Sequence, residues 1–327
     1  MKLDALAAEL HYLATLAPIW RALPPEVRGE FMVPDHLFPA ALAQGVEPHA
    51  WHEPHAHVGL VASGRDLGFL RGKPAILAEH GAGQSYGGDP QSARHPGYAG
   101  GDGRENVILF LCPGESCASR NSARWPDADV VGIGNPRLDD LRQIPSTNHP
   151  ATIAFAFHWS AGVCPESGSA WYQFRDHLDL LGEHHRLIGT GHPRGFQEMA
   201  DWYEKHGIIP VEDFELIVAE ADLLVADNTS VMYDWAALDR PVVALNAPEW
   251  RKHIHHGLRF WDSVPGPQVD EPADLFHAVE HADDKTSRKL RAHAARAAYT
   301  YPDHAAERAA EAILTTLDRR GDALVRH

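Results

Sequence analysis

Cysteine, long apolar runs and basic residues are all scarce in this 327-residue chain. The three cysteines form neither an even disulfide set nor a zinc-ligand spacing, so we expect reduced thiols. No window holds the apolar run that a membrane-spanning helix needs. The first ten residues carry an acidic residue and no small-residue cleavage site, so no secretory signal is expected. Together these features favour a cytoplasmic protein.

The deficit of basic residues narrows the classes of partner. There are 45 acidic residues against 29 Lys and Arg, which gives a formal net charge of −16. Nucleic-acid binding relies on phosphate neutralisation, and a membrane-docking surface relies on clustered basic residues. We therefore expect no nucleic-acid partner and, at most, peripheral membrane contact. A small molecule or a soluble acceptor is the expected partner, and the sequence carries no signature of the oligomeric state.

Short apolar runs alternate with helical patterns and predict the fold class. Helices are predicted over 3–21 and 169–181, where apolar residues recur at helical spacing. The runs that predict strands occupy 30–33, 57–62, 75–79, 107–111 and 129–134, and then 152–157, 186–191, 207–211, 222–226 and 241–246. Continuous apolar strands between helices are typical of a parallel sheet covered on both faces. The sequence therefore predicts an α/β protein with two doubly wound, Rossmann-like domains that face each other across a cleft.

A polar stretch with three prolines, residues 135–151, separates the two series and predicts a linker. We predict an acceptor-side domain over 1–145, a second domain over 146–285, and Ala-rich helices over 286–327. The tripeptide YPD interrupts these helices, and Asp303 is placed to cap the last of them.

In doubly wound sheets, ligands bind beyond the carboxyl ends of the strands, so the residues after each apolar run are candidates for the site. Residues 78–89 read AEHGAGQSYGGD, in which His80 ends a run and glycines follow. This segment is either a solvent loop with a histidine by chance or a mobile backbone that approaches a ligand beside a base. It is not a dinucleotide fingerprint, because no third glycine opens a helix at the right offset.

Two strand ends in the second half carry histidines. TGHPRG places His192 and Arg194 two residues apart, which suits phosphate recognition but also fits a solvated turn. FHWSAG places His158 and Ser160 after the first strand of the second domain. Each motif alone is weak evidence for a ligand site. All of them, however, follow the carboxyl ends of predicted strands.

The stretch VADNTSVMYDW, residues 225–235, forms a strand-to-helix junction with a helix start near Ser230. Its backbone amides, its hydroxyls and the positive helix end are suited to a pyrophosphate. An equally physical alternative is that Thr229 or Ser230 only caps the helix.

Two histidine-rich stretches are candidate metal sites. HAWHEPHAH, residues 49–57, has four histidines in nine residues, and imidazole is a transition-metal ligand. These residues straddle a proline and a strand start, so they do not share one helical face. RKHIHHGLRF, residues 251–260, has no ligand spacing. We therefore predict no metal.

The order of EHGAG, VGIGNPRLDDL, GTGHPR, ADLLVADNTSVMYDWAALDRPVVAL and VPGPQV resembles the CDP-glycerol glycerophosphotransferase family of teichoic acid synthesis. The resemblance runs from about His57 to Val269 and implies the two-domain GT-B glycosyltransferase fold, with C-terminal helices that cross back to the first domain. It implies transfer of a glycosyl or polyol-phosphate group from a nucleotide-diphosphate donor to an acceptor hydroxyl. The donor is then a substrate, and no cofactor is expected.

By this resemblance, His80 is the general base on the acceptor hydroxyl and His192 is a second essential histidine at the donor phosphates. With the strand-end analysis, the predicted donor-binding residues are Arg194, His158, Ser160, Asp227, Asn228, Thr229, Ser230 and Asp234. The predicted acceptor-side loop comprises Gly81, Gly83, Gln84 and Ser85. Ala82 replaces the threonine of the family's HGT motif, and Asn228 replaces an aromatic residue. These departures bear on whether the donor carries a glycerol group more than on the predicted fold.

Other functions stay open. A UDP-sugar 2-epimerase shares the architecture, but it needs a cluster of carboxylates, and the sequence shows no clear one. A nucleotide-sugar-binding protein without catalysis is a further alternative, because Ala82 weakens one motif. A nucleic-acid glucosyltransferase is disfavoured by the net charge.

Overall fold

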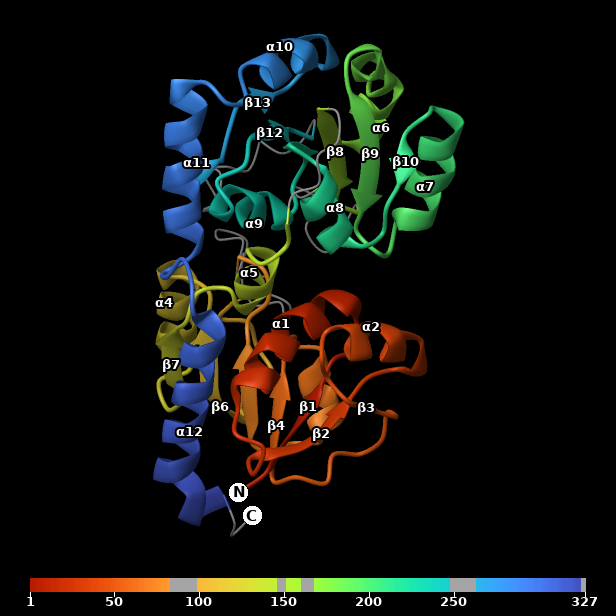
Figure 1. Cartoon of the computed structure of the whole chain (residues 1–327). Coiled ribbons are helices and arrows are strands. Elements are labelled where there is room, and N and C mark those ends of the chain that lie inside the picture. Colours follow the sequence, from red (N-terminus) through yellow and green to blue (C-terminus); the bar gives the residue numbers. More distant parts are fainter. Residues whose placement is uncertain (83–98, 146–150, 160–167, 248–262, 325–327) are drawn as a thin grey trace. The chain divides into compact units, whose positions relative to one another are not determined.

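The computed structural model describes residues 1–82, 99–145, 151–159, 168–247 and 263–324. Its contacts divide the chain into two compact units (Figure 1). Unit 1 comprises Met1–Asp140 and Ala297–His327, and unit 2 comprises Leu141–Arg296. The sequence predicted divisions after residues 145 and 285, whereas the contacts divide the chain after Asp140 and Arg296.

Unit 1 is built on a seven-stranded parallel sheet with the order β3-β2-β1-β4-β5-β6-β7. Its strands are β1 (Leu3–Leu6), β2 (Arg28–Met32), β3 (Pro48–His49), β4 (Val58–Val61), β5 (Ala75–Ala78), β6 (Val107–Cys112) and β7 (Asp129–Gly132). Its helices are α1 (Leu10–Ala22), α2 (Phe38–Ala43), α4 (Glu115–Arg124), α5 (Pro136–Leu141) and α12 (Ala305–Leu324). All five runs predicted as strands in this half are confirmed.

The predicted helix over 3–21 is wrong in its first part. Residues Leu3–Leu6 form β1, a central strand between β2 and β4, and α1 begins only at Leu10. All four β1 residues are buried. A short stretch that is buried on every side fits helical and strand spacing equally well, so pairing with β2 and β4 decides its conformation.

Unit 2 contains a six-stranded parallel sheet with the order β10-β9-β8-β11-β12-β13. Its strands are β8 (Thr152–Phe157), β9 (Arg186–Gly191), β10 (Ile209–Pro210), β11 (Leu223–Ala226), β12 (Val242–Leu245) and β13 (Gln268–Val269). Its helices are α6 (Trp171–Phe174), α7 (Phe196–Lys205), α8 (Phe214–Glu220), α9 (Val231–Ala237), α10 (Leu275–Glu280) and α11 (Lys285–Ala298). The five predicted strands of this half are confirmed.

The helix predicted over 169–181 is only partly regular. α6 covers four residues, and two 3₁₀ turns, Arg175–His177 and Asp179–Glu183, follow it. Its predicted apolar stripe is buried nevertheless, as the sequence indicated, at Trp171, Phe174, Leu178 and Leu181. None of the helices in the part of the chain that the structure describes is long and apolar enough to cross a membrane.

The C-terminal helix α12 belongs to unit 1, where it lies beside α1 (Figure 1). Ala309, Ile313 and Leu317 of α12 share a buried apolar cluster with Leu13 of α1. We expected Asp303 to cap this helix. The carboxylate that accepts a hydrogen bond from its first turn, at the Ala306 N–H, is instead that of Asp139 (2.9 Å).

Each sheet has a point where the strand order reverses. In unit 1 the chain runs outward from β1 to β3 and then returns to β4 on the other side of β1. In unit 2 it runs from β8 to β10 and returns to β11 on the other side of β8. Doubly wound sheets bind ligands at this reversal, beyond the carboxyl ends of the strands. The two candidate locations are therefore the ends of β1 and β4, and the ends of β8 and β11.

Candidate active site

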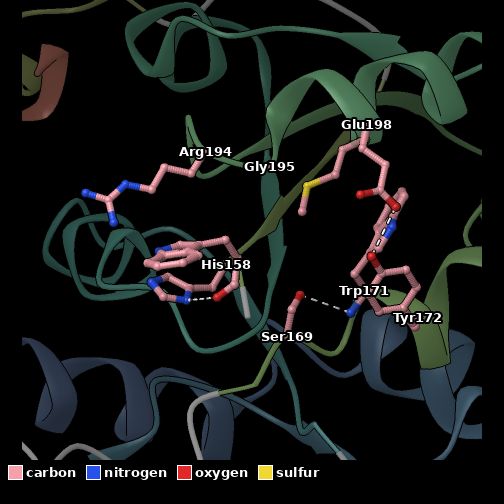
Figure 2. A pocket seen from close by; sticks show the side chains of 9 residues that line it. His158, Ser169, Trp171, Tyr172, Arg194, Gly195 and Glu198 are labelled. Carbon is pink, nitrogen blue, oxygen red and sulfur yellow. Dashed lines mark hydrogen bonds between the residues drawn. The ribbon is translucent and has the colours of Figure 1, made fainter. Parts of the chain in front are cut away.

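A pocket of about 220 Å³ lies at the carboxyl ends of β8 and β9 in unit 2 (Figure 2). Its lining residues come from the end of β8, the end of β9, the first turn of α7, and the segment that enters α6. They are His158, Trp159, Ser169, Trp171, Tyr172, Arg194, Gly195, Glu198 and Met199. His158 and Arg194 lie on one side of the pocket, and Glu198 and Tyr172 lie on the other. The predicted residues His158 and Arg194 are thus brought together.

Aromatic contacts join the two strand ends. The ring centroids of His158 and His192 are 5.2 Å apart, at an interplanar angle of 71°. Trp159 contacts His192 with a centroid separation of 5.7 Å. The guanidinium carbon of Arg194 lies 4.9 Å from the centroid of the Trp159 ring, within the range of a cation–π contact. His192 therefore stands directly beside the pocket and in contact with two of its lining residues.

The backbone partners of the two histidines fix different tautomers. His158 Nδ1 lies 2.6 Å from the Trp159 carbonyl oxygen, which can only accept, so Nδ1 carries the proton. In contrast, the Arg194 N–H donates to His192 Nδ1 (3.2 Å), so the neutral His192 ring carries its proton on Nε2. In their neutral forms, His158 therefore offers a lone pair at Nε2, and His192 offers an N–H there.

Burial is the main cause that lowers the pKa of His158 to about 4. The hydrogen bond to the Trp159 carbonyl opposes this shift, and the positive charge of Arg194 adds to it. His158 is therefore neutral at pH 7.

Asp227, which the sequence predicted to bind the donor, is 1% exposed and bonds to the protein. Its carboxylate accepts from the His158 N–H (2.7 Å), the Ser169 hydroxyl (2.8 Å) and the Ala170 N–H (2.9 Å). Burial raises the pKa of Asp227 to about 7, against the effect of these hydrogen bonds. Asp227 thus ties the end of β11 to the backbone of His158 and to a lining residue of the pocket.

The rest of the predicted pyrophosphate motif follows β11. The helix start near Ser230 is confirmed, because α9 begins at Val231. Thr229 and Ser230 are half-buried, whereas Asn228 and Asp234 are 4% and 2% exposed. Among the described residues, the lining of the pocket includes none of these four. Their predicted contact with the donor stays a prediction.

In unit 1, His80 follows β5 and lies beside the end of β4. Its Nδ1 is 2.7 Å from the Ala62 carbonyl oxygen, so Nδ1 carries the proton and Nε2 carries the lone pair. The ring packs edge-on against Tyr12 (4.9 Å) and lies 5.3 Å from the ring of His11. Burial lowers the pKa of His80, more than the Ala62 hydrogen bond raises it, so the ring is neutral at pH 7.

The acceptor-side loop is described only at its start. Gly81 has φ +58°, a left-handed conformation that glycine adopts without strain, and Ala82 is buried. Gly83, Gln84, Ser85 and Ser160 lie outside the described residues, as does the histidine-rich stretch 251–260.

Sequence reasoning missed much of the pocket wall. Trp171 is one of the apolar residues that predicted a helix over 169–181, and it is buried, but its neighbour Tyr172 lies on the pocket and donates to Glu198 Oε1 (3.1 Å). Met199 and Glu198 come from the first turn of α7, just after the strand end that carries His192. Both residues lie in the first turn of the helix that follows β9, and this position could have marked them as candidates for the site.

Residues 171–316 match the family described as CDP-Glycerol:Poly(glycerophosphate) glycerophosphotransferase. This range contains β9, α7, β11 and α9, and with them His192, Arg194, Thr229 and Ser230. It covers less than half of the chain. No curated protein matches the sequence.

Several solved structures resemble the whole chain. A variant of the wall teichoic acid polymerase TagF soaked with CDPG has 15% identity and a TM-score of 0.67, over 100% of this chain and 90% of that one. The S. aureus MnaA–UDP co-structure has 14% identity and a TM-score of 0.65, over 97% of each chain. A UDP-N-acetylglucosamine 2-epimerase has 12% identity and a TM-score of 0.62, over 98% and 96%. Sequence identities of 12–15% support a similarity of fold alone.

The class of the protein follows from these findings. Two doubly wound parallel-sheet domains with this likeness confirm the predicted GT-B fold. Within that fold, residues 171–316 are similar to the glycerophosphotransferase family. The resemblance that the motif order predicted is thereby confirmed.

Proposed function

We propose that this protein transfers a glycosyl or polyol-phosphate group from a nucleotide-diphosphate donor to an acceptor hydroxyl in the cytoplasm. The observation that supports this most is the meeting of His158, His192 and Arg194 beside the pocket at the carboxyl ends of β8 and β9. Two of these residues lie in the region that matches the glycerophosphotransferase family. The donor is a substrate, and the proposed reaction needs no cofactor.

The donor diphosphate is proposed to contact Arg194 and His192. A guanidinium presents planar donors suited to phosphate oxygens, and the His192 ring, whose Nδ1 accepts from the Arg194 N–H, carries its proton on Nε2. Fixed donors of this kind stabilise the negative charge that develops on the leaving nucleotide. Asp227 acts as a positioning residue, because its carboxylate holds the backbone of His158.

The start of α9 completes the proposed donor site. Thr229 and Ser230 are half-buried hydroxyl residues that follow β11, the neighbour of β8 in the sheet. Asn228 and Asp234 are buried, so they support the shape of this junction more than they contact the donor.

His80 is the proposed general base. It is neutral, and its Nε2 carries the lone pair because the Ala62 carbonyl holds the proton on Nδ1. As the acceptor oxygen bonds to the transferred group, its proton moves to His80 Nε2. The bond between that group and the nucleotide breaks, and the electron pair leaves with the nucleotide. The leaving product is a nucleoside monophosphate when a polyol phosphate moves, and a nucleoside diphosphate when a glycosyl group moves.

A thermal-shift panel of CDP-, UDP-, GDP- and dTDP-linked donors tests this proposal. We expect one class of donor to raise the melting temperature, because a ligand that binds only the folded state stabilises it. If none of the four classes shifts the transition, the proposed function is wrong.

A UDP-sugar 2-epimerase is the alternative enzyme, since an epimerase shares the fold. An epimerase needs several carboxylates, whereas Glu198 is the single carboxylate among the described lining residues. Incubating the protein with the best donor alone separates the two, because an epimerase forms the epimer without any acceptor. Donor binding with neither product would identify a binding protein without catalysis.

A further inference from the structure

A second cluster of titratable side chains lies in unit 1 and uses none of the residues proposed for transfer. Glu30 of β2 contacts His52, with 2.7 Å between Oε2 and Nε2. His55 Nδ1 lies 3.9 Å from the same oxygen, and His49 Nδ1 lies 3.9 Å from Glu30 Oε1. One ligand atom each from Glu30, His52 and His55 lies within 4.8 Å of the other two. The three histidines belong to the stretch for which the sequence predicted no metal.

A buried carboxylate fixes the backbone on both sides of this cluster. Asp4 of β1 is 2% exposed. Its Oδ1 accepts from the Glu30 N–H (2.9 Å) and its Oδ2 accepts from the Ala56 N–H (2.7 Å), next to His55. The approach requires Gly29, because a Cβ there would lie 2.1 Å from Asp4 Oδ1. Asp4 of β1 therefore fixes the backbone of Glu30 relative to the backbone next to His55.

A second set of hydrogen bonds holds the loop between the histidines. Lys73 Nζ donates to the carbonyls of Pro54 and Ala56. Asn106 in turn donates to the Lys73 carbonyl (2.7 Å). The segment that carries His52 and His55 is thus tied to the core of unit 1, although the His55 side chain is 78% exposed.

The contact between Glu30 and His52 requires a positive charge. His52 Nδ1 lies 2.8 Å from the Glu53 carbonyl oxygen, so the neutral ring carries its proton there and its lone pair on Nε2. That lone pair faces a carboxylate oxygen at 2.7 Å. Two electron pairs at this distance need either a second ring proton or a cation to bind them. A histidine that donates its other N–H to a carbonyl has the orientation typical of a metal ligand.

We propose that Glu30, His52 and His55 bind a divalent transition ion of the zinc type, with His49 within reach as a fourth ligand. Imidazole nitrogens with a carboxylate oxygen suit Zn²⁺. Ligand atoms of a tetrahedral zinc site lie about 3.3 Å apart at bond lengths near 2.0 Å. The separations of 2.7 and 3.9 Å lie on either side of that value, so small rotamer changes close the site.

A matched control cluster lies in unit 2. His277 and Glu280 of α10 and His281, the residue that follows this helix, also place their ligand atoms within 4.8 Å, but all three side chains are exposed. His281 Nδ1 lies 2.9 Å from the carbonyl of His277. The same residue types are thus present on an exposed surface, whereas the buried Asp4 anchors the backbone beside Glu30 and His55.

The test is a zinc titration of the full, untagged chain after treatment with a chelator, with Zn²⁺ alone as the probe. We expect the H277A/H281A variant to keep one tight Zn²⁺ site and the H52A/H55A variant to bind at least tenfold more weakly. His57→Ala, an exposed histidine of the same stretch, should leave the affinity unchanged. Co²⁺ added in place of Zn²⁺ should give a visible absorption band that Glu30→Gln removes.

The proposal is overturned if the parent protein binds no Zn²⁺, or if H52A/H55A binds it as tightly as the parent. The single variant His55→Ala guards against misfolding, because this side chain is largely exposed, and it should also weaken binding. None of these outcomes depends on the transfer reaction, so failure here and failure of the proposed function are distinguishable.

Discussion

At the residue scale, the backbone partner of each histidine decides what its ring can do. The Ala62 and Trp159 carbonyls hold the proton of His80 and His158 on Nδ1, whereas the Arg194 N–H leaves the proton of His192 on Nε2. In their neutral forms, His80 and His158 therefore carry a lone pair on Nε2, whereas His192 carries an N–H there. The sequence could not predict this, because Ala62 lies 18 residues before His80 and meets it only through the pairing of β4 with β5.

Replacing His80 tests the proposed base. We expect His80→Ala to lower kcat by about 10²- to 10⁴-fold, the usual contribution of a general base. Donor affinity should change little, because the donor is proposed to bind in unit 2. Steady-state kinetics and donor titration measure the two effects separately. His36→Ala, an exposed histidine of the same unit, is the control, and a fully active His80→Ala enzyme would refute the assignment.

The lowered pKa of His80 gives a signed pH dependence. A base acts when it is unprotonated, and burial shifts the His80 pKa below the ordinary histidine value of 6.5. Activity should therefore persist as the pH falls through 6.5 and decline only at lower pH. The acidic limb of kcat/KM against pH measures this, and a midpoint at or above 6.5 would contradict the assignment.

At the scale of elements, Gly189 of β9 allows Tyr203 of α7 to pack closely against this strand. A Cβ at Gly189 would lie 2.5 Å from the ring of Tyr203, which is fully buried and donates to the Thr190 carbonyl (3.1 Å). We expect Gly189→Ala to lower the free energy of unfolding by about 1–3 kcal/mol through overpacking. Gly182→Ala is the matched control, because a Cβ there meets Leu187 at an ordinary 3.4 Å. Urea denaturation measures both, and equal midpoints would contradict this account.

The elements show how far the sequence predicts the fold. Long apolar runs such as those of β6 and β8 were predicted, because burial on both faces leaves an unbroken pattern. β3, β10 and β13 have two residues each, and only β10 was predicted, because apolar residues flank it whereas Glu47 precedes β3 and Asp270 follows β13. β1 was predicted as helix, since its conformation depends on its neighbours in the sheet.

The site was predictable where it follows strand ends and not elsewhere. His158, His192 and Arg194 were predicted because the carboxyl ends of β8 and β9 meet at one edge of the sheet. The hydrogen bonds of the Asp227 carboxylate to the backbone N–H groups of His158 and Ala170 were not predicted. The motif at the strand-to-helix junction does not show which groups this carboxylate contacts. The grouping of Glu30 with His52 and His55 was likewise hidden, because Asp4 brings distant segments together.

At the scale of the whole molecule, the two ends of the chain fold as one unit. Ile313 of α12 is fully buried in the cluster that holds β1 and α1. We expect Ile313→Ala to lower the free energy of unfolding by about 2–5 kcal/mol, as for other large-to-small core substitutions. Chemical denaturation measures the change, with Thr315→Ala, an exposed position of the same helix, as the control. Equal stability of the two variants would show that α12 is not part of this core.

The site of unit 2 is proposed to bind a nucleotide-diphosphate donor through Arg194, and calorimetric titration of the best donor tests this most directly. A hydrogen bond to a charged group contributes about 1.5–3 kcal/mol, so Arg194→Ala should weaken binding by roughly tenfold to a hundredfold. Arg296→Ala, at an exposed arginine of α11, should bind like the unmodified protein. Equal affinity in all three proteins, or no binding by any of them, would contradict the account.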